Sequence, residues 1–308
     1  MNGTTTAQLA EKTAKAVTGS VEEWTGFLQS AARLYKYSYP EQLLIYAQRP
    51  DATACASYEI WNQTMRRYVR RGARGIALPD GAGAVRYVFD VADTGPRKSS
   101  REVKTWALDE NNREAVAHAL ETQYGSAAKL GIAGQLEEIA MQQSMDYWQW
   151  HQDELRGIVD GSFLEGYDEL NLEIAFRNTA AASVKYMLLS RCNLAREYQI
   201  EPEELAGVLE WNTSAASGAL GSAISELSEG VLRQIERTIR QYERSQNHDE
   251  RTDVHEERRV LDSRPDSSRT ADGAEQIRTD SGAVSEGASD DHLQQPAPEW
   301  EADRAPDG

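Results

Sequence analysis

The sequence has little of what marks most enzyme and membrane classes. Lysine occurs only seven times in 308 residues, and no lysine follows a glycine, which excludes a phosphate-binding loop ending in Gly-Lys. No two of the nine prolines are adjacent, which excludes the Asn-Pro-Pro-aromatic signature of amino-methyltransferases. No apolar run reaches about 18 residues, so we expect no transmembrane helix and no membrane partner.

Cysteine and histidine are also scarce. Cys55 and Cys192 are too few for a disulfide framework, and their spacing does not suit zinc. The five histidines complete no zinc-protease motif, and no Ser-His-Asp arrangement can be read from spacing. The N-terminus has no apolar core and carries Glu11, so we expect no signal peptide. These absences predict a cytoplasmic protein that is not an enzyme and has no cofactor or metal.

Charge is divided unevenly along the chain. The net charge is −17, but residues 1–100 have 13 basic and 9 acidic side chains, whereas residues 101–308 have 20 basic and 41 acidic ones. A balance of +4 followed by one of −21 predicts zones with different partners.

The first zone predicts a small α+β domain at residues 20–95, after a flexible N-terminus at residues 1–19. Ser20-Val-Glu-Glu23 is a capping-box pattern before apolar residues at helical spacing, and Pro40 suits the start of a second helix. Strands with a glycine turn are expected from residue 67 to 78, and another strand from 85 to 91.

The remainder predicts an all-α region at residues 106–244 and a disordered acidic tail at residues 245–308. Apolar residues from Leu220 to Tyr242 recur at steps of three and four, which describes one helical stripe. Either the rest of the helical zone or another protein covers that stripe. Tyr147, Trp148 and Trp150 are expected in the core, and an exposed docking patch for a partner helix is the alternative. The tail has few large apolar residues, so it cannot offset its chain entropy.

Clustered arginines form the most specific local feature. Five arginines lie between residues 66 and 74, and no acid occurs between Glu59 and Asp80. Guanidinium groups hold phosphates and aromatic rings stack on unpaired bases, so this composition suits single-stranded nucleic acid. A solvated or protein-docking face is the alternative. The candidate residues are Arg66, Arg67, Arg70, Arg71 and Arg74, with Arg49 and Gln48 nearby and Tyr37, Tyr39 and Trp61 for stacking.

Two resemblances sharpen this interpretation. The segments Tyr37–Pro50 and Arg67–Ile76, with Ala52-Thr-Ala54 and Trp61 between them, resemble the N-terminal domain of ArdC-type antirestriction proteins, although Glu41 stands where that family often has Asn. The resemblance covers residues 20–95 and implies a single-stranded-DNA-binding module.

The rest of the chain resembles the region that follows in large helicase/methylase proteins of conjugative, mobile elements. The matching stretches are Asp160–Glu169, Leu188–Cys192 and Val231–Glu236. The catalytic motifs of those proteins are absent, so the resemblance implies a separated or truncated N-terminal piece.

Two functions from different classes follow. The first is a non-catalytic single-stranded-DNA-binding module, working with helicase, methylase or relaxase components of the same element. The second is an acidic helical adaptor at residues 106–242 that docks such a component. A decayed gene fragment with no role of its own is a third possibility.

Overall fold

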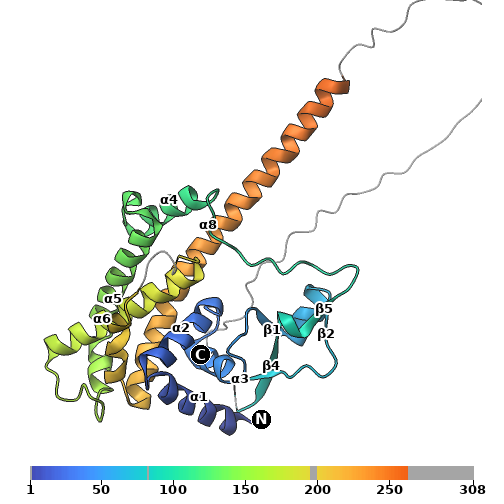
Figure 1. Ribbon diagram of the computed structural model, residues 1–308. Coiled ribbons are helices and arrows are strands. Elements are labelled where there is room, and N and C mark those ends of the chain that lie inside the picture. Colours follow the sequence, from blue (N-terminus) through green and yellow to red (C-terminus); the bar gives the residue numbers. More distant parts are fainter. Residues whose placement is uncertain (1, 82, 195–199, 263–308) are drawn as a thin grey trace, which may run out of the picture. The chain divides into compact units, whose positions relative to one another are not determined.

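The chain combines a small strand-containing region with a mostly helical remainder (Figure 1), which confirms the predicted α+β class. The structure is a computed structural model that describes residues 2–81, 83–194 and 200–262, with the backbone alone for residues 247–262. Residues up to 256 belong to one compact unit. No helix of the described part is long and apolar enough to cross a membrane.

Three helices open the chain. Asn2 caps the first by accepting a hydrogen bond from the Thr5 amide at 2.9 Å, and Ser20 caps the second by accepting from the Glu23 amide at 3.2 Å, as its sequence pattern predicts. Glu41 accepts a hydrogen bond from the backbone amide of Ser38 at 3.2 Å and thereby stabilises the start of the third helix. These helices are α1 (Gly3–Val17), α2 (Val21–Arg33) and α3 (Tyr39–Gln48).

The expectation of a flexible N-terminus is wrong, because residues 3–17 are the regular helix α1. Helix α1 packs against α3 and the strand at residues 76–79, and it buries Ala14 and Val17. The sequence of α1 is rich in alanine and threonine and has few large apolar residues. Its helix therefore depends on the partner surface.

Five short strands form two antiparallel sheets. In the first sheet the order is β1-β4-β3, and in the second β2 pairs with β5. Helix α3 covers one face of the first sheet, where Leu44, Ile45, Ile76 and Val88 form a small core. The strands are β1 (Cys55–Ser57), β2 (Arg67–Val69), β3 (Ile76–Pro79), β4 (Val85–Asp90) and β5 (Thr94–Pro96).

The helical remainder is built around the antiparallel neighbours α5 and α6 and the long helix α8, as Figure 1 shows. Gly125 adopts φ +75° where α4 ends, a left-handed conformation that suits glycine. The helices are α4 (Arg113–Tyr124), α5 (Gly131–Gly157), α6 (Glu169–Arg191), α7 (Pro202–Leu205) and α8 (Ser214–Asp262). The shorter turns are η1 (Ile60–Thr64), η2 (Val91–Asp93), η3 (Ala128–Leu130) and η4 (Ala206–Glu210).

A single large core crosses the predicted boundary between residues 95 and 106. Trp24 of α2 is fully buried, and its Nε1 donates to Ser183 Oγ of α6 at 3.0 Å. Helix α2 therefore packs with the helical region as well as with α3, so residues 20–95 and 106–244 are not separate bodies. The large core draws on both predicted domains, from Ala14 to Ile239.

The apolar stripe of α8 is covered from within the chain. Leu220, Ile224, Val231, Ile235 and Ile239 are all at most 2% exposed and belong to the large core. This outcome confirms, at these five positions, the first of the two explanations given for the stripe. The backbone of α8 continues to Asp262. The rest of the predicted tail, residues 263–308, lies outside the described part.

A buried polar network ties α8 to the end of α2. Tyr35 Oη donates to Glu236 Oε2 at 2.5 Å, and Lys36 Nζ lies 2.7 Å from the same oxygen. Trp106 Nε1 donates to Tyr35 Oη at 3.0 Å, and the guanidinium of Arg191 lies 3.4 Å from the centre of the Trp106 ring. The network fixes the segment after β5 against the helices.

Replacing Glu236 with Gln is expected to lower the free energy of unfolding by about 2 kcal/mol at pH 7, because hydrogen bonds to a buried charge are lost. Burial acts to raise the pKa of Glu236, but hydrogen bonds from Lys36 and Tyr35 outweigh burial and hold that pKa below its usual value. The stabilisation is therefore complete above pH of about 4.3 and is lost as pH falls through the lowered pKa. Urea titrations at pH 7 and pH 3 measure the difference in free energy of unfolding between wild type and the Glu236→Gln variant. This difference should be smaller at pH 3. Glu226→Gln, on the exposed face of the same helix, is the control, and an equal loss in both variants would contradict the network's role.

Candidate nucleic-acid interface

The clustered arginines lie on the two-stranded ribbon of β2 and β5. Arg67 pairs with Pro96, Tyr68 with Gly95 and Val69 with Thr94. The chain enters this ribbon through the π-helical turn η1 and then Arg66, whose φ of +52° is left-handed and strained for arginine. Strained residues and π-helical turns concentrate at functional sites in proteins.

A second basic stretch lies beside the first. Ser100 Oγ donates to the Arg66 carbonyl at 2.7 Å, and the Arg101 amide donates to the Met65 carbonyl at 2.9 Å. The segment after β5 therefore runs along the start of β2 and adds three cations to the five predicted ones. We call the set the basic ribbon: Arg66, Arg67, Arg70, Arg71, Arg74, Arg97, Lys98 and Arg101.

The basic ribbon keeps its charge unneutralised. Within the described residues, none of its eight cations lies within 4.0 Å of a carboxylate. Seven of the eight are exposed, and Arg67 is half-buried with its Nε donating to Thr94 Oγ1 at 2.8 Å. Unpaired cations on one ribbon make a local positive field that the distant acidic residues do not cancel, since screening acts over about 8 Å.

Two acids near the strands of the ribbon, Asp90 and Asp93, are already engaged, whereas Glu102 next to Arg101 is exposed. Asp90 is buried and accepts hydrogen bonds from the backbone amides of Thr53 and Ala54 at 2.7 and 3.0 Å. Asp93 accepts from Arg49 Nη1 at 2.6 Å.

Arg49 and Gln48, which we expected to lie close to the bound DNA, have hydrogen-bond partners within the protein. The hydrogen bond from Arg49 to Asp93 raises the pKa of this guanidinium above its usual value. Gln48 Nε2 donates to the Ala77 carbonyl at 3.0 Å, and its Oε1 accepts from the Ala77 amide at 3.0 Å. This pair of bonds joins α3 to β3, so Gln48 positions the sheet.

Of the three predicted stacking residues, Tyr39 and Trp61 are buried and Tyr37 is half-buried. Tyr39 and Trp61 are 3% and 2% exposed, and Trp61 Nε1 donates to the Phe89 carbonyl at 2.8 Å. Tyr37 Oη donates to the Cys55 carbonyl at 2.8 Å. Burial raises the pKa of both Tyr37 and Tyr39. The aromatic motif Tyr37-Ser-Tyr39 therefore fills the interior.

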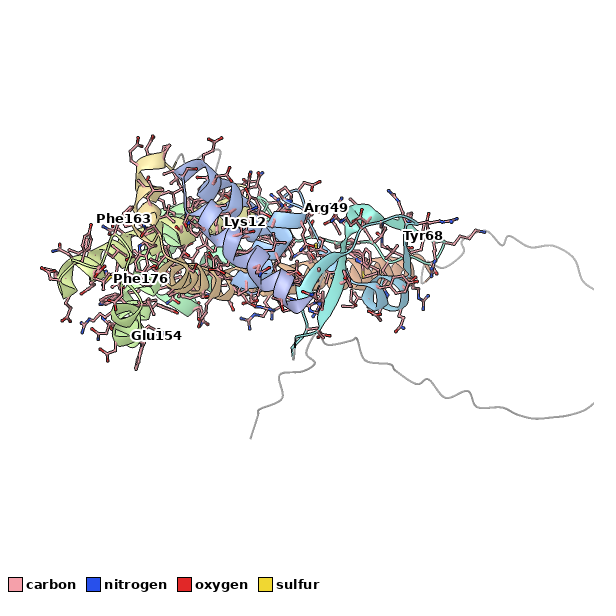
Figure 2. The ribbon with its side chains drawn as sticks, turned by 90° about the horizontal axis from the view of Figure 1, so that it is seen from below. Lys12, Arg49, Tyr68, Glu154, Phe163 and Phe176 are labelled. Atoms are coloured by element: carbon pink, nitrogen blue, oxygen red, sulfur yellow. The ribbon has the colours of Figure 1, made fainter. Side chains whose placement is uncertain are left out.

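Other tyrosines take the exposed positions. Within the described residues before 106, only Tyr58, Tyr68 and Tyr87 are large apolar side chains with high exposure. Tyr68 is 43% exposed and belongs to the basic ribbon's own strand β2 (Figure 2). Its ring lies over Gly95, where any side chain would collide with it. The sequence signal for the exposure of Tyr68 was the alternation of side chains along a strand. Tyr68 points to the face opposite to Arg67 and Val69.

Metal-ligating side chains and thiols are the remaining candidate groups. The described residues contain no cluster of three His, Cys, Asp or Glu side chains arranged for a metal. Burial raises the pKa of the Cys55 and Cys192 thiols to about 12, which disfavours the nucleophilic thiolate.

Comparison of the chain with protein-family models, with curated proteins and with solved structures finds no match.

Proposed function

We propose that the protein is a non-catalytic module that binds single-stranded DNA on the basic ribbon. The observation that carries this proposal is that eight cations without a carboxylate partner among the described residues lie on the same ribbon as the exposed Tyr68. Guanidinium groups bind phosphate oxygens bidentately, and a tyrosine face accepts any base.

This arrangement favours a single strand over a duplex. In duplex DNA the base faces stack on each other, so Tyr68 finds no free base face. Phosphates are available in single-stranded and duplex DNA alike. Sequence preference is weak because neither contact reads base edges. Following the ArdC-type resemblance of residues 20–95, the DNA is a transferred strand of a mobile element, and the protein acts in the cytoplasm. Helicase, methylase or relaxase components of that element are its proposed partners.

Fluorescence anisotropy of labelled single-stranded and duplex oligonucleotides with the full chain tests this function. Tyr68→Ala is expected to weaken single-strand binding about tenfold, because one stacked base contributes about 1–3 kcal/mol. Its salt dependence should stay unchanged, since no phosphate contact is removed. Tyr68→Phe keeps the ring and should bind like wild type. Equal affinity of the Ala and Phe variants would remove Tyr68 from the site.

An acidic helical adaptor is the second candidate function. The apolar stripe of α8 is buried and therefore does not support an adaptor function. The turn from α5 to α6 and the start of α6 support it, because they expose apolar side chains. Phe163 and Leu170 are 70% and 64% exposed in the helical part (Figure 2), and Tyr167 and Ile174 are 40% and 45% exposed. Exposed apolar groups of this kind mark interaction surfaces. Absence of DNA binding by the full chain at low salt would favour this adaptor over the DNA-binding module.

A further inference from the structure

A second exposed tyrosine, Tyr87, lies at the end of the loop that carries three of the arginines. This loop joins β2 to β3 and contains Arg70, Arg71 and Arg74. Gly75 is its last residue, and a β-carbon placed on Gly75 would lie 3.1 Å from Tyr87 Cδ1 and 3.2 Å from Tyr87 Cβ. The Tyr87 side chain therefore packs against the residue that directly follows Arg74.

The sheet leaves Tyr87 open to solvent. Its neighbour Val88 on β4 belongs to the small core that α3 covers. Because successive side chains of a strand point to opposite faces, Tyr87 lies on the face of the sheet away from α3. Tyr87 is 46% exposed, against 43% for Tyr68. One exposed tyrosine thus precedes the arginine loop in sequence, and the other packs against the end of that loop.

We propose that Tyr87 stacks on a second base of the same single strand, so that the strand follows the arginine loop from Tyr68 to Tyr87. This inference rests on the proposed function and extends its site from one stacking ring to two. The phosphates between the two stacked bases then lie beside Arg70, Arg71 and Arg74. Stacking on two rings, with guanidinium groups along the backbone, is a general way to hold an unpaired strand.

The dimensions of the loop permit this path. Tyr68 lies seven residues before Gly75, so the protein chain between them spans at most about 25 Å. Twelve nucleotides cover about 40 Å even at the spacing of about 3.4 Å that duplex DNA has along each strand. Small single-strand-binding domains cover about 4–16 nucleotides, so a 12-nucleotide strand is long enough to reach both rings.

Tyr58, the third exposed tyrosine before residue 106, lacks this setting. It is 53% exposed, but it follows β1, which pairs with the edge of β4 opposite to β3. The exposed carboxylate of Glu59 follows it directly and repels phosphate. Tyr58 is therefore the matched control, an exposed tyrosine of the same region outside the proposed path.

Anisotropy titrations of the full chain with a labelled 12-nucleotide oligothymidine test the inference. Tyr87→Ala is expected to weaken binding about tenfold, the loss typical of one stacked base, with an unchanged salt dependence. Tyr87→Phe keeps the ring and should bind like wild type, whereas Tyr58→Ala should change affinity less than twofold. Tyr87→Leu still fills the space beside Gly75 but has no aromatic face, so it should weaken binding as much as Tyr87→Ala.

Combining Tyr68→Ala with Tyr87→Ala should weaken binding about 100-fold, because the effects of independent sites add in free energy. If Tyr87→Leu binds like wild type, Tyr87 has a packing role and this inference is overturned. A loss of equal size in Tyr58→Ala, or a double variant no weaker than Tyr68→Ala alone, overturns it as well. In each of these cases the proposed function stands, provided that wild type binds the oligonucleotide. Absence of binding by wild type overturns the proposed function and this inference together.

Discussion

Replacing Arg66, Arg67, Arg70 and Arg71 with Ala is expected to weaken single-stranded DNA binding by about 100-fold or more at 50 mM salt. None of these four side chains has a carboxylate partner among the described residues, and Arg66, Arg70 and Arg71 are exposed, so we expect them to bind phosphates and release counterions. The slope of log affinity against log salt should fall by about 3, since each phosphate contact of a single strand contributes about 0.7. Anisotropy titrations at four salt concentrations measure both quantities.

The control for this prediction removes four exposed cations elsewhere. Lys129, Arg233, Arg237 and Arg244 lie in the helical part, and their replacement with Ala changes the net charge by the same amount. If DNA binding depends on local contacts, the control keeps most of its affinity and its slope. If both variants lose affinity equally, binding follows net charge and the site is not the basic ribbon.

Replacing Trp24 with Ala is expected to lower the free energy of unfolding by about 3–5 kcal/mol, because it empties a large buried volume and leaves Ser183 without its partner. Trp24 joins α2 to α6, so strand-containing and helical parts should lose stability in one transition. Urea unfolding followed by circular dichroism and by tryptophan fluorescence measures this loss, and the two curves should coincide.

Trp150→Ala is the matched control, because Trp150 is 84% exposed and its removal should change stability by less than about 0.5 kcal/mol. This exposure differs from the expectation that Tyr147, Trp148 and Trp150 all lie in the core. Trp148 is buried and Tyr147 stacks on Phe176, whereas Trp150 points to solvent. A Trp24→Ala variant that unfolds in two separate steps would restore the two-domain interpretation.

Local sequence signals predicted the elements whose determinants are local. Ser20 and Pro40 marked helix starts because caps and proline act within one turn, and the alternation from Val85 to Val91 marked a strand. Helix α1 escaped prediction because its few apolar contacts are made with α3 and β3, which lie far along the chain.

For the candidate site, the sequence predicted the exposed arginines but not the exposed tyrosine. Arginine near a turn stays exposed because its burial is costly, so the five arginines could be identified from sequence. Tyrosine has no such constraint, and its burial depends on which surface packs against it. Tyr37 and Tyr39 face cores that other segments complete, whereas Tyr68 rests on Gly95 across a strand pair.

The sequence by itself determined the α+β class, the division between a basic beginning and an acidic remainder, and the arginine cluster, because composition and short-range spacing carry that information. Tertiary structure decided that α2 shares a core with α6, that residues 97–101 extend the basic ribbon, and that Tyr68 is the ring exposed on that ribbon. Each of these depends on contacts between residues distant in sequence, such as Trp24 with Ser183 and Ser100 with Arg66, and local spacing does not encode such contacts.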